Sequence, residues 1–211
     1  MVSHPPVPRT SRPLARPFPS PGRALQLAHR ELTIAATGTP AQIQALGDLG
    51  LLPRPWDPPS CIHADLRAEL WDWLENVVDW FNTEYVWDVS DTIPACWPQH
   101  PHLVHEIAVL ADQRRRAGLS LTSDMLEDWH RYAVPGFLER MHRRLHHQCE
   151  ETHQPWPARS RHTRHTGSRD NRAQHYQTDA DLLRPAQTAG TPRLGLVDLD
   201  TGEVLPPSQH T

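Results

Sequence analysis

The sequence predicts a mainly α-helical protein, in which a small helical domain is flanked by long, disordered arms rich in proline and arginine. Helical spacing of apolar residues is strongest in one part of the chain, residues 61–150. The 22 prolines and the hydrophobic fraction of 37% are unusual for a chain that packs along its whole length. We therefore expect one folded core of about 100 residues.

Before this core, the sequence predicts two segments of different character. Residues 1–22 are rich in proline, which lacks a backbone N–H and fixes φ, so we expect an extended, disordered arm. Residues 23–60 are predicted to form short helices and a proline-rich linker. Helix-forming residues occupy 23–37, Gly38 is a typical C-terminal stop, and Thr39, which precedes a proline, is a typical N-cap for the next helix.

The strongest predicted helix covers residues 63–87. Its apolar side chains recur at intervals of three and four, and acidic side chains fall on the opposite side, as expected for a helix that buries one face. Burying one aromatic ring contributes roughly 4–6 kcal/mol as an upper bound, so we interpret the apolar stripe as core packing. The stripe consists of Leu66, Leu70, Trp73, Leu74, Val77, Val78, Trp80, Phe81 and Tyr85, and the acidic face of Glu69, Asp72, Glu75 and Asp79.

Two more helices are predicted to complete the core. The first covers about residues 101–117, beginning at a proline and ending before a glycine. The second covers about residues 123–149. Pro135 removes one intrahelical hydrogen bond, so it should kink or break this helix near Tyr132.

After the core the apolar pattern is lost. Residues 151–192 are rich in arginine, histidine and serine, and we expect them to form a disordered tail. Residues 193–206 alternate β-branched and other residues around a D-T-G-E turn, which predicts a small β-hairpin. Such a hairpin is marginally stable by itself.

Charge is distributed unevenly along the chain, whose formal net charge is −4. Residues 57–91 carry nine acidic side chains and one arginine, whereas residues 1–56 and 151–175 are basic. All 21 residues counted as lysine or arginine are arginines. A GC-rich genome explains this bias, although arginine also suits bidentate recognition of phosphate or carboxylate.

The sequence also carries expectations about location. No segment approaches the ~20 apolar residues of a membrane span, and the N-terminus lacks the apolar region of a secretory signal. Three cysteines, an odd number, fit a reducing compartment. We therefore expect a cytoplasmic protein without a membrane partner.

One cluster has the residue types of a metal site. Cys96, His100, His102 and His105 lie within ten residues, where a loop leads into a helix, and zinc accepts both thiolate and imidazole. Cys61, His63 and Cys149 could complete such a site. The spacing matches no established zinc pattern, and 15 histidines make clusters frequent by composition. Two interpretations stay open, a zinc site and a loop that caps the core.

A second cluster is basic. It consists of Arg140, Arg143 and Arg144 in the third core helix and Arg159, Arg161 and Arg164 in the tail. Such a series could follow a phosphate backbone. The alternative is a solvated surface, because no helix-turn-helix pattern is present and the acidic helix would repel DNA. The sequence has no G-x-S-x-G motif and no glycine-rich phosphate loop, so we assign no catalytic or cofactor-binding residue.

Three runs of the sequence, residues 71–82, 93–117 and 126–141, together resemble an uncharacterised actinobacterial helical domain. Genes for that domain often lie among plasmid, conjugative-element or phage genes. The W-P-Q-H-P and D-W-H-R-Y runs carry most of the resemblance. It implies an accessory protein of a mobile element and transfers no catalytic residue.

The leading hypothesis is therefore a non-enzymatic helical interaction module that binds another protein. Two alternatives remain. One is a nucleic-acid-associated factor that uses the arginine-rich tail. The other is a zinc-binding module centred on Cys96.

Overall fold

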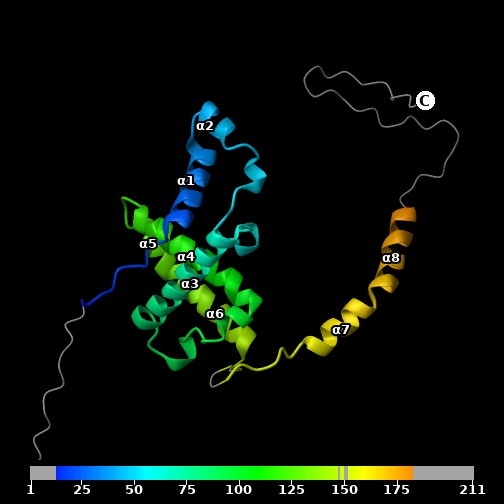
Figure 1. Ribbon diagram of the computed structural model, residues 1–211. Helices are drawn as coiled ribbons and strands as arrows, with labels where there is room; N and C mark the ends of the chain where they lie inside the picture. The colour runs from blue at the N-terminus through cyan, green and yellow to red at the C-terminus, as the bar shows by residue number, and fades with distance from the viewer. Residues whose placement is uncertain (1–12, 147, 150–151, 183–211) are drawn as a thin grey trace, which may run out of the picture. The chain divides into compact units, whose positions relative to one another are not determined.

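A computed structural model describes residues 13–146, 148–149 and 152–182 (Figure 1). Every regular element within these ranges is a helix or helical turn, which confirms the mainly α-helical prediction. The chain divides into two compact units, one ending at Gln154 and the other beginning at Pro155. Within the described residues, no helix has the length and apolar character needed to cross a membrane.

The first unit is built around α3 (Ala64–Glu84), the 21-residue helix predicted from the apolar stripe. It packs against α1 (Arg23–Thr37) and α4 (Pro101–Leu119), and α4 packs against α6 (Val134–Leu145). The predicted stripe is buried, because eight of its nine members lie in the core and Tyr85 is partly buried against it. The eight are Leu66, Leu70, Trp73, Leu74, Val77, Val78, Trp80 and Phe81.

Short elements connect these helices. The predicted N-cap at Thr39 is present, since its hydroxyl accepts from the backbone of Gln42 at the start of α2. The remaining bounds are α2 (Pro40–Ala45), the 3₁₀ turns η1 (Leu49–Leu51), η2 (Pro58–Ser60), η3 (Val89–Asp91) and η4 (Trp97–Gln99), and α5 (Asp124–Asp128).

Pro135 is accommodated by a widened helical turn. A π-helical turn, η5 (Trp129–Ala133), joins α5 to α6, and the Val134 N–H donates to the carbonyl of Trp129, five residues earlier. The wider turn gives room at the point where a proline ring would crowd the preceding carbonyl of an α-helix. The chain therefore stays helical here, and the predicted break does not occur.

The N-terminal strap, residues 13–22, differs from the prediction of a disordered arm. It lies along α3, where the indole N–H groups of Trp73 and Trp80 donate to the carbonyls of Pro19 and Arg16 at 3.0 and 3.1 Å. The Arg16 guanidinium also pairs with Asp79 at 3.0 Å. An extended proline-rich segment has no internal hydrogen bonds, so its carbonyls are available to these buried indoles.

The acidic face of α3 also caps α1. No local side chain caps this helix, but the carboxylate of Glu69 accepts from the backbone N–H groups of Ala24 and Leu25 at 3.2 and 2.7 Å. A carboxylate is favourable at a helix N-terminus because the first N–H groups lack intrahelical partners. Gly22 permits this approach, since a Cβ there would lie 2.4 Å from the Glu69 carboxyl carbon.

The tail also differs from the prediction. Two helices, α7 (Arg159–Gly167) and α8 (Arg169–Leu182), occupy part of the segment 151–192 that was expected to be disordered. Neither helix buries a side chain, so the sequence of this segment has no periodic apolar residues from which a helix could be predicted. The predicted hairpin at 193–206 lies outside the described residues.

A polar group is buried between α1 and α4. His29 and Asp112 are 8% and 4% exposed, and Arg115 donates to one Asp112 oxygen through Nε at 3.0 Å and Nη2 at 2.7 Å. The pKa of His29 is lowered from 6.5 to about 4, mainly by burial and also by the charge of Arg115, while Asp112 opposes the change. His29 is therefore neutral near pH 7.

Trp80→Ala should lower the free energy of unfolding by about 3–5 kcal/mol, because a large buried aromatic leaves a cavity when it is truncated. The Trp80 side chain is 3% exposed and also anchors the strap, whereas Trp87 is 99% exposed. Trp87→Ala should change stability by less than about 0.5 kcal/mol. Chemical denaturation of both variants measures the contrast, and equal losses would contradict the assigned core.

His29 should make the fold sensitive to acid. Its pKa is lower in the folded than in the unfolded chain, so the unfolded chain binds more protons between pH 6.5 and about 4. Stability should fall across this window as the pH is lowered, by up to about 3 kcal/mol. Denaturation at several pH values should show a shallower decline for His29→Gln, and an unchanged slope would contradict the neutral, buried imidazole.

Candidate metal centre

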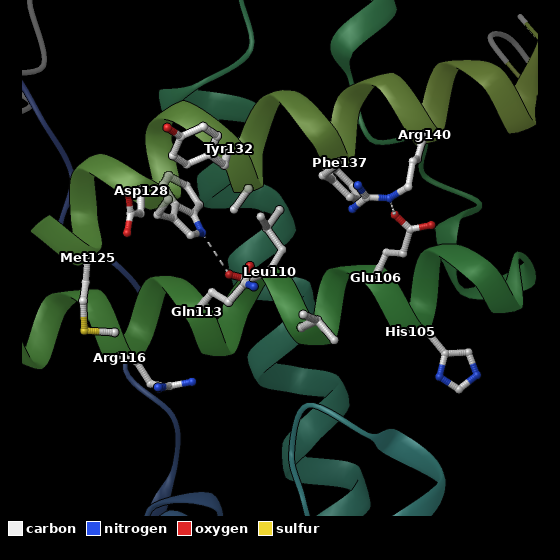
Figure 2. A pocket seen from close by; sticks show the side chains of 13 residues that line it. His105, Glu106, Leu110, Gln113, Arg116, Met125, Asp128, Tyr132, Phe137 and Arg140 are labelled. Carbon is white, nitrogen blue, oxygen red and sulfur yellow. Dashed lines mark hydrogen bonds and ion pairs between the residues drawn. The ribbon is translucent and has the colours of Figure 1, made fainter.

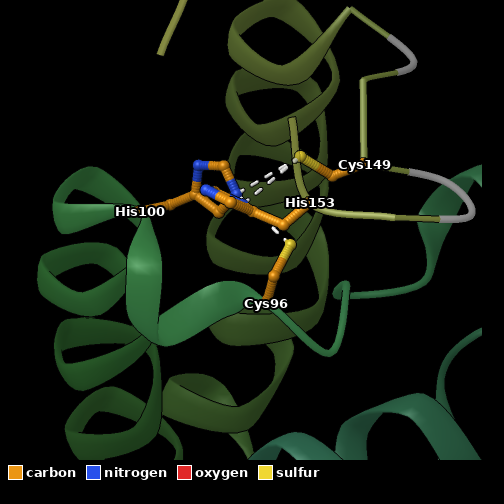
Figure 3. Close-up of side chains that lie close together, drawn as sticks. All are labelled: Cys96, His100, Cys149 and His153. Atoms are coloured by element: carbon orange, nitrogen blue, oxygen red, sulfur yellow. Dashed lines mark hydrogen bonds between the residues drawn. The ribbon is translucent and has the colours of Figure 1, made fainter. Parts of the chain in front are cut away.

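Four potential metal ligands meet where η4 leads into α4 and the chain returns after α6 (Figure 3). They are Cys96, His100, Cys149 and His153, and one ligand atom from each lies within 4.8 Å of all the others. Cys149 is buried, Cys96 and His100 are partly buried, and His153 is exposed. The group therefore lies at the edge of the core, with one ligand facing solvent.

The separations between these atoms suit tetrahedral coordination. His100 Nε2 lies 3.3 Å from Cys96 Sγ and 3.5 Å from Cys149 Sγ, and His153 Nδ1 lies 3.8 Å from Cys149 Sγ. Zn–S and Zn–N bonds of about 2.3 and 2.0–2.1 Å at tetrahedral angles place sulfur and nitrogen ligands about 3.5 Å apart. One cation could thus contact all four atoms after small side-chain movements.

Two short segments with the same spacing supply the ligands. In the first, Cys96 precedes η4 and His100 follows it, so a single 3₁₀ turn separates the two side chains. In the second, His146 caps the C-terminus of α6 in the left-handed conformation (φ 47°), and Cys149 is also left-handed (φ 71°). Both segments read C-x-x-x-H, and the reversal after α6 brings the second to the first.

The left-handed backbone of His146 and Cys149 has a cost. For residues other than glycine this conformation is unfavourable by roughly 1–2 kcal/mol, so it persists only where other interactions hold it. A hydrogen bond from Gln148 N–H to the Leu145 carbonyl, at 2.8 Å, supports the turn. Coordination of Cys149 would offset the remaining cost.

The surroundings of Cys96 and His100 shift both pKa values toward the neutral forms. Burial raises the pKa of the Cys96 thiol, and its hydrogen bond and charge interaction with Cys149 raise it further. Burial lowers the pKa of His100 most, and the charges of His153 and His102 lower it further. A lower pKa favours the neutral imidazole, which is the form that binds metals. The backbone N–H of Gln154 donates to Cys149 Sγ at 3.2 Å and orients this side chain.

The structure brings together two of the four ligands predicted from sequence. Cys96 and His100 belong to the cluster, while the ring of His102 lies 5.7 Å from that of His100 and its buried Nε2 has no hydrogen-bond partner among the described residues. His105 lines a different cavity. Cys61 lies apart as well, with its thiol near the Arg54 carbonyl.

His153 is the ligand that sequence reasoning did not identify, and Cys149 was considered only as one way to complete a site. The available signal was the repeated C-x-x-x-H spacing at 96–100 and 149–153. Local density of histidines instead favoured His102 and His105, which lie on the following helix.

A separate groove of about 720 Å³ lies between α4, α5, η5 and α6 (Figure 2). Met125 and Tyr132 are exposed on its rim, and the Trp129 indole N–H donates to the Leu110 carbonyl at 3.1 Å on its floor. Glu106 and Arg140 pair across one end at 2.7 Å. The groove is thus mainly apolar and separate from the Cys/His cluster.

The basic residues predicted to contact nucleic acid fall into two groups. In the first unit, Arg140 and Arg144 both pair with Glu106, and Arg143 pairs with Glu139. These acids partly neutralise the predicted basic surface of α6. Arg159, Arg161 and Arg164 belong to the second unit, on α7.

Comparison with known proteins found no matching family model, no matching curated protein and no matching solved structure.

Glu106→Gln should destabilise the first unit by about 1–2 kcal/mol, since it leaves two arginines of α6 without their partner on α4. The Glu106 side chain is 16% exposed, whereas Glu139, which pairs within α6, is 68% exposed. Glu139→Gln should therefore change stability by less than about 0.5 kcal/mol. Urea denaturation tests both variants, and a larger loss for Glu139→Gln would contradict the assigned role of Glu106.

Proposed function

We propose that this chain is a zinc-binding, non-enzymatic helical module, in which Zn²⁺ joins the turn before α4 to the segment after α6. The proposal rests on one observation: two C-x-x-x-H pairs, far apart in sequence, place four ligand atoms within 4.8 Å of one another. Among 15 histidines and three cysteines, this arrangement is the metal-ligand cluster found in the described residues.

The ligand types favour zinc over other biological cations. Two thiolates and two imidazoles form the tetrahedral set that zinc prefers in structural sites. Magnesium and calcium require oxygen ligands, and no carboxylate belongs to the group of four. A thiolate pair also provides two negative charges, which would balance Zn²⁺ and make this partly buried centre electrically neutral.

The proposed role is structural because the protein supplies all four ligands. Catalytic zinc sites keep one position for water or substrate, whereas a Cys₂His₂ set fills the tetrahedron. The cleft beside the site contains about 520 Å³ and is lined by Cys96, Cys149 and His153. Substrate chemistry there would require one of these ligands to leave the metal.

The metal would stabilise a part of the fold that has little apolar packing. Met141 is the last core side chain of α6, Leu145 is partly buried, and the described residues after them bury only Cys149. Metal affinity would then contribute directly to folding, because the unfolded chain has no preformed site.

Purified protein should contain about one equivalent of zinc, and a chelator should lower its melting temperature. Cys149→Ala and His153→Ala should each reduce the bound metal and weaken the effect of chelation. The matched controls are Cys61→Ala and His105→Ala, because Cys61 and His105 lie outside the cluster. Elemental analysis and thermal melts, with circular dichroism to confirm helix content, provide the measurements.

Two outcomes would contradict the proposal. Wild-type protein that takes up no stoichiometric zinc after purification and reconstitution would exclude the site. Equal metal loss in His105→Ala and His153→Ala would exclude the assigned ligand set.

A further inference from the structure

A second cleft lies between the N-terminal strap, α1 and α4, apart from the Cys/His cluster. It contains about 740 Å³. Three arginines contribute to its lining, Arg30 from α1 and Arg114 and Arg115 from α4. Apolar side chains, among them Phe18 and Ile34, form other parts of the wall. The cleft therefore combines concentrated positive charge with apolar surface.

The positive charge in this cleft exceeds the negative charge. The carboxylate of Asp112 faces Arg115 and accepts hydrogen bonds from both Nε and Nη2 of its guanidinium. Neither Arg30 nor Arg114 forms an ion pair with a carboxylate of the described residues. His29 is neutral near pH 7, so the three guanidinium groups and one carboxylate leave an excess of about two positive charges.

Arg114 is held in place without an acidic partner. Its guanidinium carbon lies 5.3, 5.6 and 5.7 Å from the ring centroids of Phe18, Trp80 and Trp129, which hold it by cation–π contact. Its buried Nε has no hydrogen-bond partner among the described residues. A Cβ at Gly118 would lie 3.2 Å from Arg114 Nη1, so glycine leaves room for the guanidinium.

Arg115 is also held in a fixed position. Its two bonds to Asp112 bury one edge of the guanidinium, and the Asp112 side chain is 6% exposed. Arg114 and Arg115 are consecutive on α4 and both line the cleft, so a bound anion could interact with two guanidinium groups. Groups fixed before binding lose little conformational entropy when a ligand arrives.

We infer that this cleft binds a phosphate monoester that carries an apolar or aromatic group. Guanidinium groups recognise phosphate through paired, charge-assisted hydrogen bonds. A phosphate monoester carries about −1.5 to −2 charges at pH 7, which matches the excess charge of the cleft better than a single carboxylate. The volume falls in the range of about 300–1,000 Å³ typical of small-molecule sites, and the apolar wall would receive the remainder of the ligand.

Titration calorimetry of the full-length protein as purified, with phenyl phosphate as the ligand, tests this inference. We expect saturable binding that is about tenfold or more tighter than that of benzoate, which has the ring but only one charge. Arg30→Gln should weaken binding about tenfold, and Arg114→Gln at least as much. The matched control is Arg116→Gln, because Arg116 is on the same helix but lines the groove on its other side.

Arg30 is exposed, so its replacement should not disturb folding, which keeps the test decisive if Arg114→Gln is unstable. Equal weakening by Arg30→Gln and Arg116→Gln would show non-specific charge attraction and overturn the site. Absence of saturable binding would also overturn it. Tighter binding of benzoate than of phenyl phosphate would overturn the assignment of a phosphate group. None of these results depends on the identity of the metal ligands.

Discussion

The aromatic stripe of α3 is the constraint on which the rest of the first unit depends. Burying Trp73, Trp80 and Phe81 requires cover from more than one direction, and the N-terminal strap, α1, α4 and α6 supply it. The same helix also satisfies polar groups of its neighbours. Its indoles donate to carbonyls of the strap, and its carboxylate at Glu69 caps α1. One helix, α3, thus provides both the centre of the hydrophobic core and hydrogen-bond partners for the backbone of its neighbours.

The Cys/His cluster lies where this aromatic core ends. Beyond Met141 the chain offers few apolar side chains, yet it turns back toward η4 through two left-handed residues. The proposed cation would stabilise this position, because four ligand atoms converge there and coordination needs no apolar area. The arginine-lined cleft is placed differently, because the aromatic core holds the Arg114 guanidinium and Asp112 holds that of Arg115.

The core was predictable from sequence, whereas features that depend on tertiary contact were not. Apolar residues spaced three and four apart predicted α3. Pro135 indicated where the third helix would be irregular, but it did not indicate that the irregularity would be a π turn. The sequence of the strap has no pattern that predicts its binding to α3, because it binds through backbone carbonyls, which every residue has. Cys96 and His100 stood out because they are neighbours in sequence. The return of Cys149 and His153 depends on the turn after α6, which local spacing does not encode.

X-ray absorption at the zinc edge tests the central claim most directly, because it reports the atoms around the metal. Coordination by Cys96, His100, Cys149 and His153 predicts four ligands, two sulfurs at about 2.3 Å and two nitrogens at about 2.0–2.1 Å. Cys149→Ala should remove one sulfur from this shell. A first shell made only of nitrogen and oxygen, or one unchanged in Cys149→Ala, would contradict the proposed centre.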